Sequence, residues 1–243
     1  MPAPHDGSGN VLLRQVSHAM FWNAAMLPVI AVVNLAAAVM IRRGFGLESG
    51  VYDIALGVVN TLLAHSALGV STTIVQFVPG LDRTAGRAAV RMFVTRVATL
   101  RLGLLLAVLI ALGAFSDQAA SLLGLGPSGG WIIRLVSVLV LLRAVADLAI
   151  KAMQSLLAHL RANLVQLAQA IALVVAVVFT LASGGGMTTL LASLAALSVA
   201  VAVISVWMAA RTIGHADRTD NGSPISLPSW SKIWAFALFM YMF

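Results

Sequence analysis

Residues 188–210 read TTLLASLAALSVAVAVISVWMAA, and no charged side chain interrupts this stretch. A helix needs about 20 mostly apolar residues to cross the roughly 30 Å hydrocarbon core of a lipid bilayer. Because that core holds no water, the helix must satisfy its own backbone N–H and C=O groups. The stretch therefore predicts a membrane-spanning helix.

The same criterion of length and composition is met elsewhere in the chain. The other stretches cover residues 17–41, 50–78, 90–115, 131–156 and 163–182. A last apolar run, 229–243, gives about 22 Å of helix, which is short for a span, so we expect a longer protein cut within its seventh helix. The fold predicted is an all-α membrane protein with a six-helix transmembrane bundle over residues 17–211 and the start of a seventh helix.

The overall composition supports a membrane environment. Sixty per cent of the residues are hydrophobic and 9% are charged, and the mean hydropathy is +1.00. A soluble domain carries about 25% charged residues, because its surface must face water. The sequence has no cysteine, which excludes disulfides, thiolate metal sites and a cysteine nucleophile within it.

Polar and turn-forming segments divide the chain. We expect a cytoplasmic tail over residues 1–16 and a cytoplasmic linker over 212–228. Pro79 and Gly80 are expected to close the second span, and the glycine-rich segments 124–130 and 183–186 to separate later spans, because Gly and Pro break helices.

The distribution of Lys and Arg predicts the orientation. With six spans, Arg42 and Arg43 lie on one side of the membrane, and Arg134 and Arg143 lie within the fourth span. The remaining basic residues lie on the side of the N-terminal tail: Arg14, Arg83, Arg87, Arg91, Arg96, Arg101, Lys151, Arg161, Arg211, Arg218 and Lys232. Since cytoplasmic loops carry an excess of Lys and Arg, the N-terminus is expected in the cytoplasm.

Two segments carry a resemblance to a known family. Residues 43–60, RGFGLESGVYDIALGVVN, and 68–79, LGVSTTIVQFVP, resemble the first loop and second helix of polysaccharide-exporter flippases of the multidrug/oligosaccharidyl-lipid/polysaccharide superfamily. Ser49-Gly50 stands where that family usually has an aromatic–Gly pair. The matching positions are Gly46, Tyr52, Leu68, Gly69, Ser71, Thr72, Phe77 and Pro79.

The resemblance implies a fold and a task. It implies two six-helix lobes around a central cavity, of which this chain would be the first, and a missing C-terminal lobe as its partner. It also implies a bacterial inner-membrane flippase that moves a lipid-linked anionic oligosaccharide, a polysaccharide precursor, by alternating access. The alternatives are a cation-coupled small-molecule antiporter of the same superfamily and a non-transporting scaffold subunit. The first span has no Asp or Glu, which counts against the antiporter.

The fourth span carries the first candidate site. Arg143, Asp147 and Lys151 are spaced i, i+4, i+8 and share one helix face. A charge at the bilayer centre costs at least about 2.5–3.5 kcal/mol, so it normally faces protein or water. The face could meet an anionic pyrophosphate, since Arg gives paired hydrogen bonds to phosphate. It could equally be a ladder of ion pairs that neutralises itself.

Two further groups are candidates for substrate binding. Asn163, Gln166 and Gln169 form a polar stripe in the fifth span, which could bind sugar hydroxyls or link helices by hydrogen bonds. Arg42 and Arg43 could line the outer mouth of a cavity, or could simply offset the dipole at a helix C-terminus.

The remaining features predict partners and exclude classes of function. Arg83, Arg87 and Arg91 lie about one helical turn apart and are expected to hold anionic membrane lipids, not nucleic acid. His65 has no second His or carboxylate at metal spacing, so no metal site is expected. We find no nucleophile–base arrangement, no paired carboxylates and no phosphate-cradling glycine motif, so neither an enzyme nor a cofactor is expected.

Overall fold

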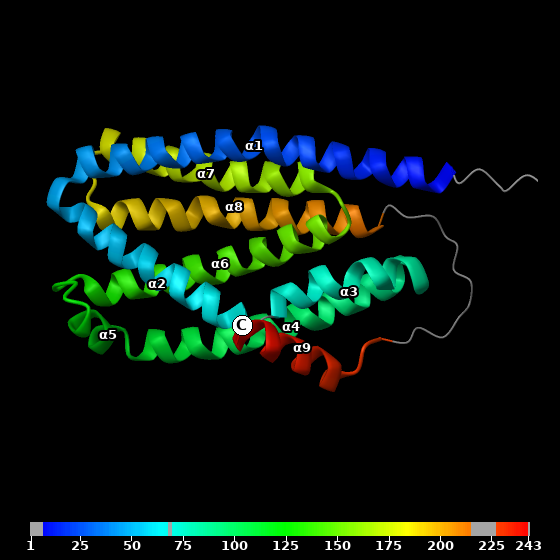
Figure 1. Ribbon diagram of the computed structural model, residues 1–243. Coiled ribbons are helices and arrows are strands. Elements are labelled where there is room, and N and C mark those ends of the chain that lie inside the picture. The colour runs from blue at the N-terminus through cyan, green and yellow to red at the C-terminus, as the bar shows by residue number, and fades with distance from the viewer. Residues whose placement is uncertain (1–6, 68–69, 215–226, 243) are drawn as a thin grey trace, which may run out of the picture.

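A computed structural model describes residues 7–67, 70–214 and 227–242, and within these ranges the protein is helical and contains no strand. The long helices lie roughly side by side, and successive passes along the bundle alternate in direction (Figure 1). In chain order the elements are α1 (Gly7–Phe45), a 3-10 turn η1 (Gly46–Glu48), α2 (Ser49–Ala67), α3 (Val70–Thr84), α4 (Gly86–Ala114), α5 (Ser116–Leu122), α6 (Gly129–Ser155), α7 (His159–Ala182), α8 (Met187–Gly214) and α9 (Trp230–Met242).

Four helical stretches in the described part of the chain are long and apolar enough to cross a membrane. They are Met20–Ser66, Gly86–Ala114, His159–Ala182 and Met187–Gly214. The first of them runs through the end of α1, η1 and most of α2. These stretches indicate a multi-pass membrane protein. Helix α6 is not one of these four stretches, and it carries four charged side chains.

Two helices cover the expected span over residues 50–78. Helix α2 ends at Ala67 and α3 begins at Val70, and residues 68–69 lie outside the described part of the chain. Pro79 does not end the second pass, because α3 continues through it to Thr84. Helix α3 is amphipathic: it buries Ile74, Val78 and Leu81 against α4 and α6 and exposes polar side chains on its other face. Tertiary packing of that face outweighs the one backbone hydrogen bond that a proline removes.

The segment boundaries differ from the expected ones at several places. Residues 7–16, expected in the tail, belong to α1, whereas residues 1–6 lie outside the described part. Most of the expected linker, residues 215–226, also lies outside it. The start of the seventh span is helical as α9, and the glycine-rich segment 183–186 separates α7 from α8.

Helix α6 is the centre of the bundle. It packs most extensively against α8 and also contacts α2, α3, α4, α5 and α7. Helix α1 packs mainly along α7 at one side of the bundle (Figure 1). Large apolar side chains on the outer face of α1, such as Val32 and Leu35, are exposed, as expected of a surface that faces lipid. The central position of α6 brings its charged face into the protein interior.

Two glycines allow the short helix α5 to lie against the first turn of α6. A Cβ atom at Gly129 would lie 2.6 Å from the Cβ atom of Ala120. A Cβ atom at Gly130 would collide with the Asp117 carboxylate. The sequence did not predict α5. The glycine-rich segment 124–130 does separate two helices, but its last two glycines, Gly129 and Gly130, already belong to α6.

Candidate binding cavity

A cavity of about 620 Å³ lies within the bundle, with its wall formed by α1, α2, α3, α4, α6 and α7. Its wall is polar for an interior of this kind. The polar and charged side chains that line it are Asn34, Ser71, Arg101, Arg143, Asp147, Lys151, Gln166 and Gln169. Five of the eight residues proposed as binding residues from the sequence therefore meet at one cavity.

Arg143 and Lys151 present two cationic groups to this cavity. They lie two turns apart on α6, and both are partly buried. Within the described part of the chain, no carboxylate forms an ion pair with either of them. The self-neutralising ladder of Arg143, Asp147 and Lys151 is therefore not what these residues form.

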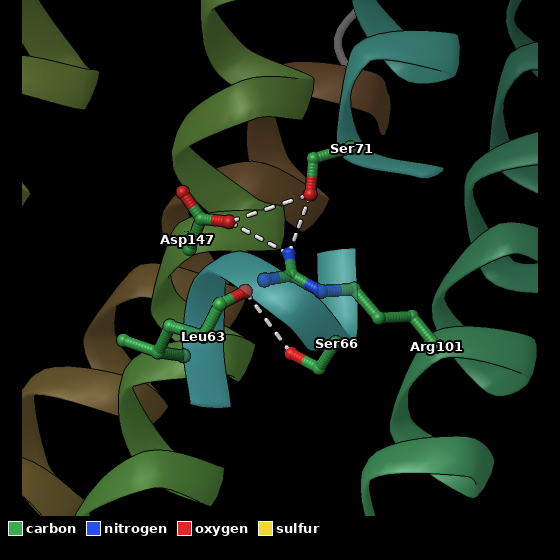
Figure 2. A network of polar contacts seen from close by, with 5 residues as sticks. All are labelled: Leu63, Ser66, Ser71, Arg101 and Asp147. Carbon is green, nitrogen blue, oxygen red and sulfur yellow. Dashed lines mark hydrogen bonds and ion pairs between the residues drawn. The ribbon is translucent and has the colours of Figure 1, made fainter. Parts of the chain in front are cut away.

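Asp147 pairs instead with Arg101, which comes from α4 (Figure 2). The Nη1 atom of Arg101 donates hydrogen bonds to Asp147 Oδ2 and to Ser71 Oγ, each at 2.6 Å. The Ser71 hydroxyl also lies 3.5 Å from Asp147 Oδ2. The Arg101 side chain is 1% exposed, whereas that of Asp147 is 37% exposed. The ion pair and Ser71 thus join three helices, α3, α4 and α6, at the cavity wall.

The position of Arg101 corrects the sequence analysis, which placed it on the cytoplasmic flank of the third span. It lies 15 residues into α4, about 22 Å from the helix start, and is fully buried. Its Nε atom has no hydrogen-bond partner among the described residues. The signal was present in the sequence, because the expected span 90–115 contains Arg101, and a charge within a span normally faces the protein interior.

The charges at the cavity do not cancel. Arg101, Arg143 and Lys151 contribute three cations, and Asp147 contributes the carboxylate that pairs with Arg101. Arg143 and Lys151 remain without a carboxylate among the described residues. In a site of low dielectric constant, such an excess of positive charge favours an anionic ligand.

The polar stripe of α7 divides between two roles. Gln166 and Gln169 line the cavity. Asn163 is 1% exposed, and its Nδ2 atom donates to Asn23 Oδ1 at 2.9 Å and to the Trp22 carbonyl at 3.3 Å. Each step of three residues turns the side chain by about 60° around the helix, so the stripe rotates by about 120° from its first to its last member. Asn163 therefore faces α1, and its hydrogen bonds link two helices.

Arg42 and Arg43 lie away from the cavity, in the last turn of α1. Arg42 Nη2 lies 3.3 Å from Asp53 Oδ2, and the two side chains are 71% and 54% exposed. Exposed ion pairs of this kind contribute at most about 1 kcal/mol, and salt screens them. The position fits cations that offset the dipole at a helix C-terminus.

Arg83, Arg87 and Arg91, which were expected to hold lipid, lie at the end of the bundle opposite to Arg42 and Arg43. Arg83 and Arg91 are exposed. Arg87 forms an ion pair with Asp82 at 2.8 Å and donates to the Thr212 carbonyl at 3.4 Å. These contacts connect the start of α4 to the end of α3 and to the end of α8.

Among the residues that the structure describes, no group of three or more His, Cys, Asp or Glu side chains could hold a metal ion. Comparisons of the chain with protein-family models, with curated proteins and with solved structures gave no match.

Proposed function

We propose that the chain is one six-helix lobe of a membrane transporter that moves a lipid-linked anionic oligosaccharide across the bacterial inner membrane by alternating access. The observation that carries this proposal is the cavity at which Arg143 and Lys151 lie without a carboxylate partner among the described residues. The resemblance of segments 43–60 and 68–79 to polysaccharide-exporter flippases supports the same class of cargo.

The cationic groups suit a diphosphate. The planar guanidinium of Arg143 can donate two parallel hydrogen bonds to phosphate oxygens, and Lys151 adds a mobile point charge. The two residues are eight positions apart on α6, which is about 12 Å along the axis. They therefore offer two successive positions along the cavity at which an anionic head group could bind as it moves.

The amide side chains suit sugars. Gln166, Gln169 and Asn34 line the same cavity and offer donors and acceptors to hydroxyl groups. The cavity volume of about 620 Å³ lies within the usual range of about 300–1,000 Å³ for small-molecule sites. Such a volume suits a head group of a few units, not a whole polymer.

Six crossings with a cytoplasmic N-terminus are part of this proposal. Helices α1, α4, α6, α7 and α8 each make one pass, and α2 with α3 makes another, in alternating directions (Figure 1). The end of the bundle where Arg83, Arg87, Arg161 and Arg211 lie would then face the cytoplasm, which agrees with the positive-inside rule.

One observation favours the second candidate, a cation-coupled antiporter. The Asp147 carboxylate lines the cavity and is 37% exposed, so a small cation could reach it. The carboxylate is already neutralised by Arg101 at 2.6 Å, and a cation would have to compete with that ion pair. The sign of the preferred ligand distinguishes the two functions.

A binding measurement tests the charge of the ligand. We expect the purified protein to bind a short polyprenyl diphosphate and to bind the uncharged polyprenol much more weakly. Arg143→Gln should weaken diphosphate binding by about 10- to 150-fold, the range that about 1.5–3 kcal/mol for a hydrogen bond to a charged group gives. Arg134→Gln is the matched control, because Arg134 lies on the same helix but donates to Ser116 at the other end and does not line the cavity.

A second experiment tests transport in cells that carry the variants in the chromosomal gene. Arg143→Gln should abolish export of surface polysaccharide at an unchanged level of folded protein, and Arg134→Gln should not. Normal export by the Arg143→Gln variant would overturn the proposal. Equal affinity for polyprenol and its diphosphate would also overturn it, and tight binding of a cationic compound that Asp147→Asn removes would favour the antiporter.

A further inference from the structure

A second cavity, of about 510 Å³, lies between α4, α6 and α8. Its wall is mostly apolar: Ala98 and Leu102 come from α4, Leu148 and Ala149 from α6, and Val206 and Ala209 from α8. The polar wall of the first cavity includes Arg101 of α4 and Asp147 of α6, so the two cavities use different faces of these helices. We refer to the second cavity as the α4–α6–α8 groove.

Basic side chains surround one end of this groove. Arg91 is exposed and lines it directly. Three further arginines lie at the neighbouring helix ends: Arg87 and Arg161 donate to the carbonyl and the hydroxyl of Thr212, and Arg211 stacks over the ring of Trp207 at 4.0 Å. The carboxylate of Asp82 pairs with Arg87, whereas no carboxylate of the described residues forms an ion pair with Arg91 or Arg161. Among the described residues, this end of the groove therefore carries an excess of positive charge.

The length of the groove matches one leaflet of a bilayer. Along α4 it extends from Arg91 to Leu102, eleven residues or about 16 Å of helix. The hydrocarbon core of a bilayer is about 30 Å thick, so one leaflet contributes about 15 Å. If Arg91 lies at the depth of the phosphate groups, the far end of the groove lies near the middle of the bilayer.

We propose that the α4–α6–α8 groove binds one anionic glycerophospholipid, with its phosphate at Arg91 and an acyl chain along the apolar walls. Charge and length both select this occupant: the end at Arg91 is cationic, the walls are apolar, and the length along α4 is that of one leaflet. The small side chains of Ala98, Ala149 and Ala209 leave the space that a chain would fill. The proposal requires that the helices lie in a membrane, and it does not depend on what the first cavity transports.

Photo-crosslinking in nanodiscs tests this proposal. The probe is a phosphatidylglycerol that carries a diazirine in one acyl chain, and mass spectrometry maps the labelled peptides. We expect labels within residues 94–102 and 206–214. Unlabelled phosphatidylglycerol should compete about fivefold better than phosphatidylcholine with the same chains, the factor that about 1 kcal/mol per arginine near the surface gives.

Two pairs of variants separate a built site from lipid that merely surrounds the protein. Arg91→Gln should remove the preference for phosphatidylglycerol, whereas Arg83→Gln, an exposed arginine that does not line the groove, should keep it. Ala98→Phe should fill the groove and lower labelling severalfold, whereas Ala88→Phe, exposed on the same helix, should not. Thermal unfolding of each variant shows whether it is folded.

Three results would overturn the proposal. The first is equal competition by the two lipids in the wild-type protein, which would indicate non-specific surrounding lipid. The second is unchanged labelling in a folded Ala98→Phe variant together with an unchanged lipid preference in Arg91→Gln. The third is a groove that stays unlabelled while the protein forms a concentration-dependent dimer, which would make a second copy the occupant. None of these results bears on binding of the polyprenyl diphosphate at the first cavity.

Discussion

The Arg101 guanidinium on α4 lies 2.6 Å from the Asp147 carboxylate on α6, and this ion pair is part of the wall of the polar cavity. Arg101 is fully buried, so Asp147 supplies the negative charge that makes its burial tolerable. Ser71 of α3 accepts a second hydrogen bond from the same Nη1 atom (Figure 2). The pair therefore holds α4 and α6 together, and it leaves Arg143 and Lys151 without a carboxylate partner among the described residues.

Asp147→Asn should destabilise the protein strongly, because it leaves the buried Arg101 without a carboxylate. Breaking a buried pair costs about 3–5 kcal/mol, and we expect about 3 kcal/mol because Asp147 is 37% exposed. For a chain of this size, that loss corresponds to a fall of roughly 6–12 °C in the unfolding temperature. Size-exclusion chromatography after heating in detergent measures it.

The double variant Arg101→Met/Asp147→Leu provides the control for this prediction. Replacing both partners by apolar residues removes the buried charge, so most of the stability should return. Arg91→Gln, which changes an exposed arginine of α4, should leave the unfolding temperature nearly unchanged. An Asp147→Asn protein that unfolds at the wild-type temperature would contradict the assigned role of the pair.

Gly130→Ala should destabilise the contact between α5 and α6. The added Cβ atom would meet the Asp117 carboxylate, so α5 would have to shift away from the first turn of α6. Overpacking of this kind costs about 1–3 kcal/mol. Gly103→Ala is a matched substitution in α4, where a Cβ atom meets nothing within 4 Å; it should stabilise the helix by about 0.5–1 kcal/mol. Similar unfolding temperatures for the two variants would count against the packing described.

Asn163→Ala and Gln166→Ala should affect different properties, although the residues are three positions apart. Asn163→Ala removes the hydrogen bonds to Asn23 and Trp22, and should cost about 1 kcal/mol of stability with little change in ligand affinity. Gln166→Ala should weaken binding of a sugar-bearing ligand and leave thermal stability unchanged, because Gln166 faces the cavity. Thermal-unfolding and binding measurements on both variants test this prediction. A loss of affinity in Asn163→Ala together with a loss of stability in Gln166→Ala would refute it.

A single cysteine at Gln169 should report the potential of the cavity. The sequence contains no cysteine, so the substitution introduces a unique thiol. An anionic methanethiosulfonate reagent should react there about tenfold faster than a cationic one, because Arg143 and Lys151 concentrate anions. The ratio should fall towards one at high salt and in Arg143→Gln/Lys151→Gln. A faster reaction with the cationic reagent would show that the cavity is not electropositive.

Single cysteines also test the membrane topology. Ser128, just before α6, and Thr84, the last residue of α3, are both exposed and lie on opposite sides in the proposed arrangement, so a cysteine is placed at each. An impermeant thiol reagent added to intact cells should label the cysteine at position 128 and not that at position 84. Permeabilised cells should show both labels, which controls for reactivity. The reverse pattern would invert the orientation predicted from the arginines.

The pattern of α6 could be predicted from sequence because it is local. A spacing of i, i+4, i+8 places Arg143, Asp147 and Lys151 on one face of any α-helix, whatever surrounds it. The cost of a charge in a bilayer then predicts that this face points into the protein. The structure places all three at one cavity.

The partners of these residues could not be predicted in the same way. In the ladder that the helix spacing allows, Asp147 would pair with Arg143 or Lys151 on its own helix, but it pairs with Arg101, 46 residues away. Asn163 was grouped with Gln166 and Gln169, and it bonds to Asn23, 140 residues away. Helix spacing says which side chains share a face, and it does not say which other helix that face meets.

The sequence by itself determined that this is a helical membrane protein, because apolar runs of membrane length leave no other way to satisfy the backbone. It also determined that the charged face of α6 belongs inside. The tertiary structure alone decided that Arg101 lies beside Asp147, that α3 packs against α4 and α6, and that no carboxylate of the described residues pairs with Arg143 or Lys151. The physical reason is that an ion pair between helices depends on how those helices pack, whereas the formation of each helix depends on its own residues and on the solvent around it.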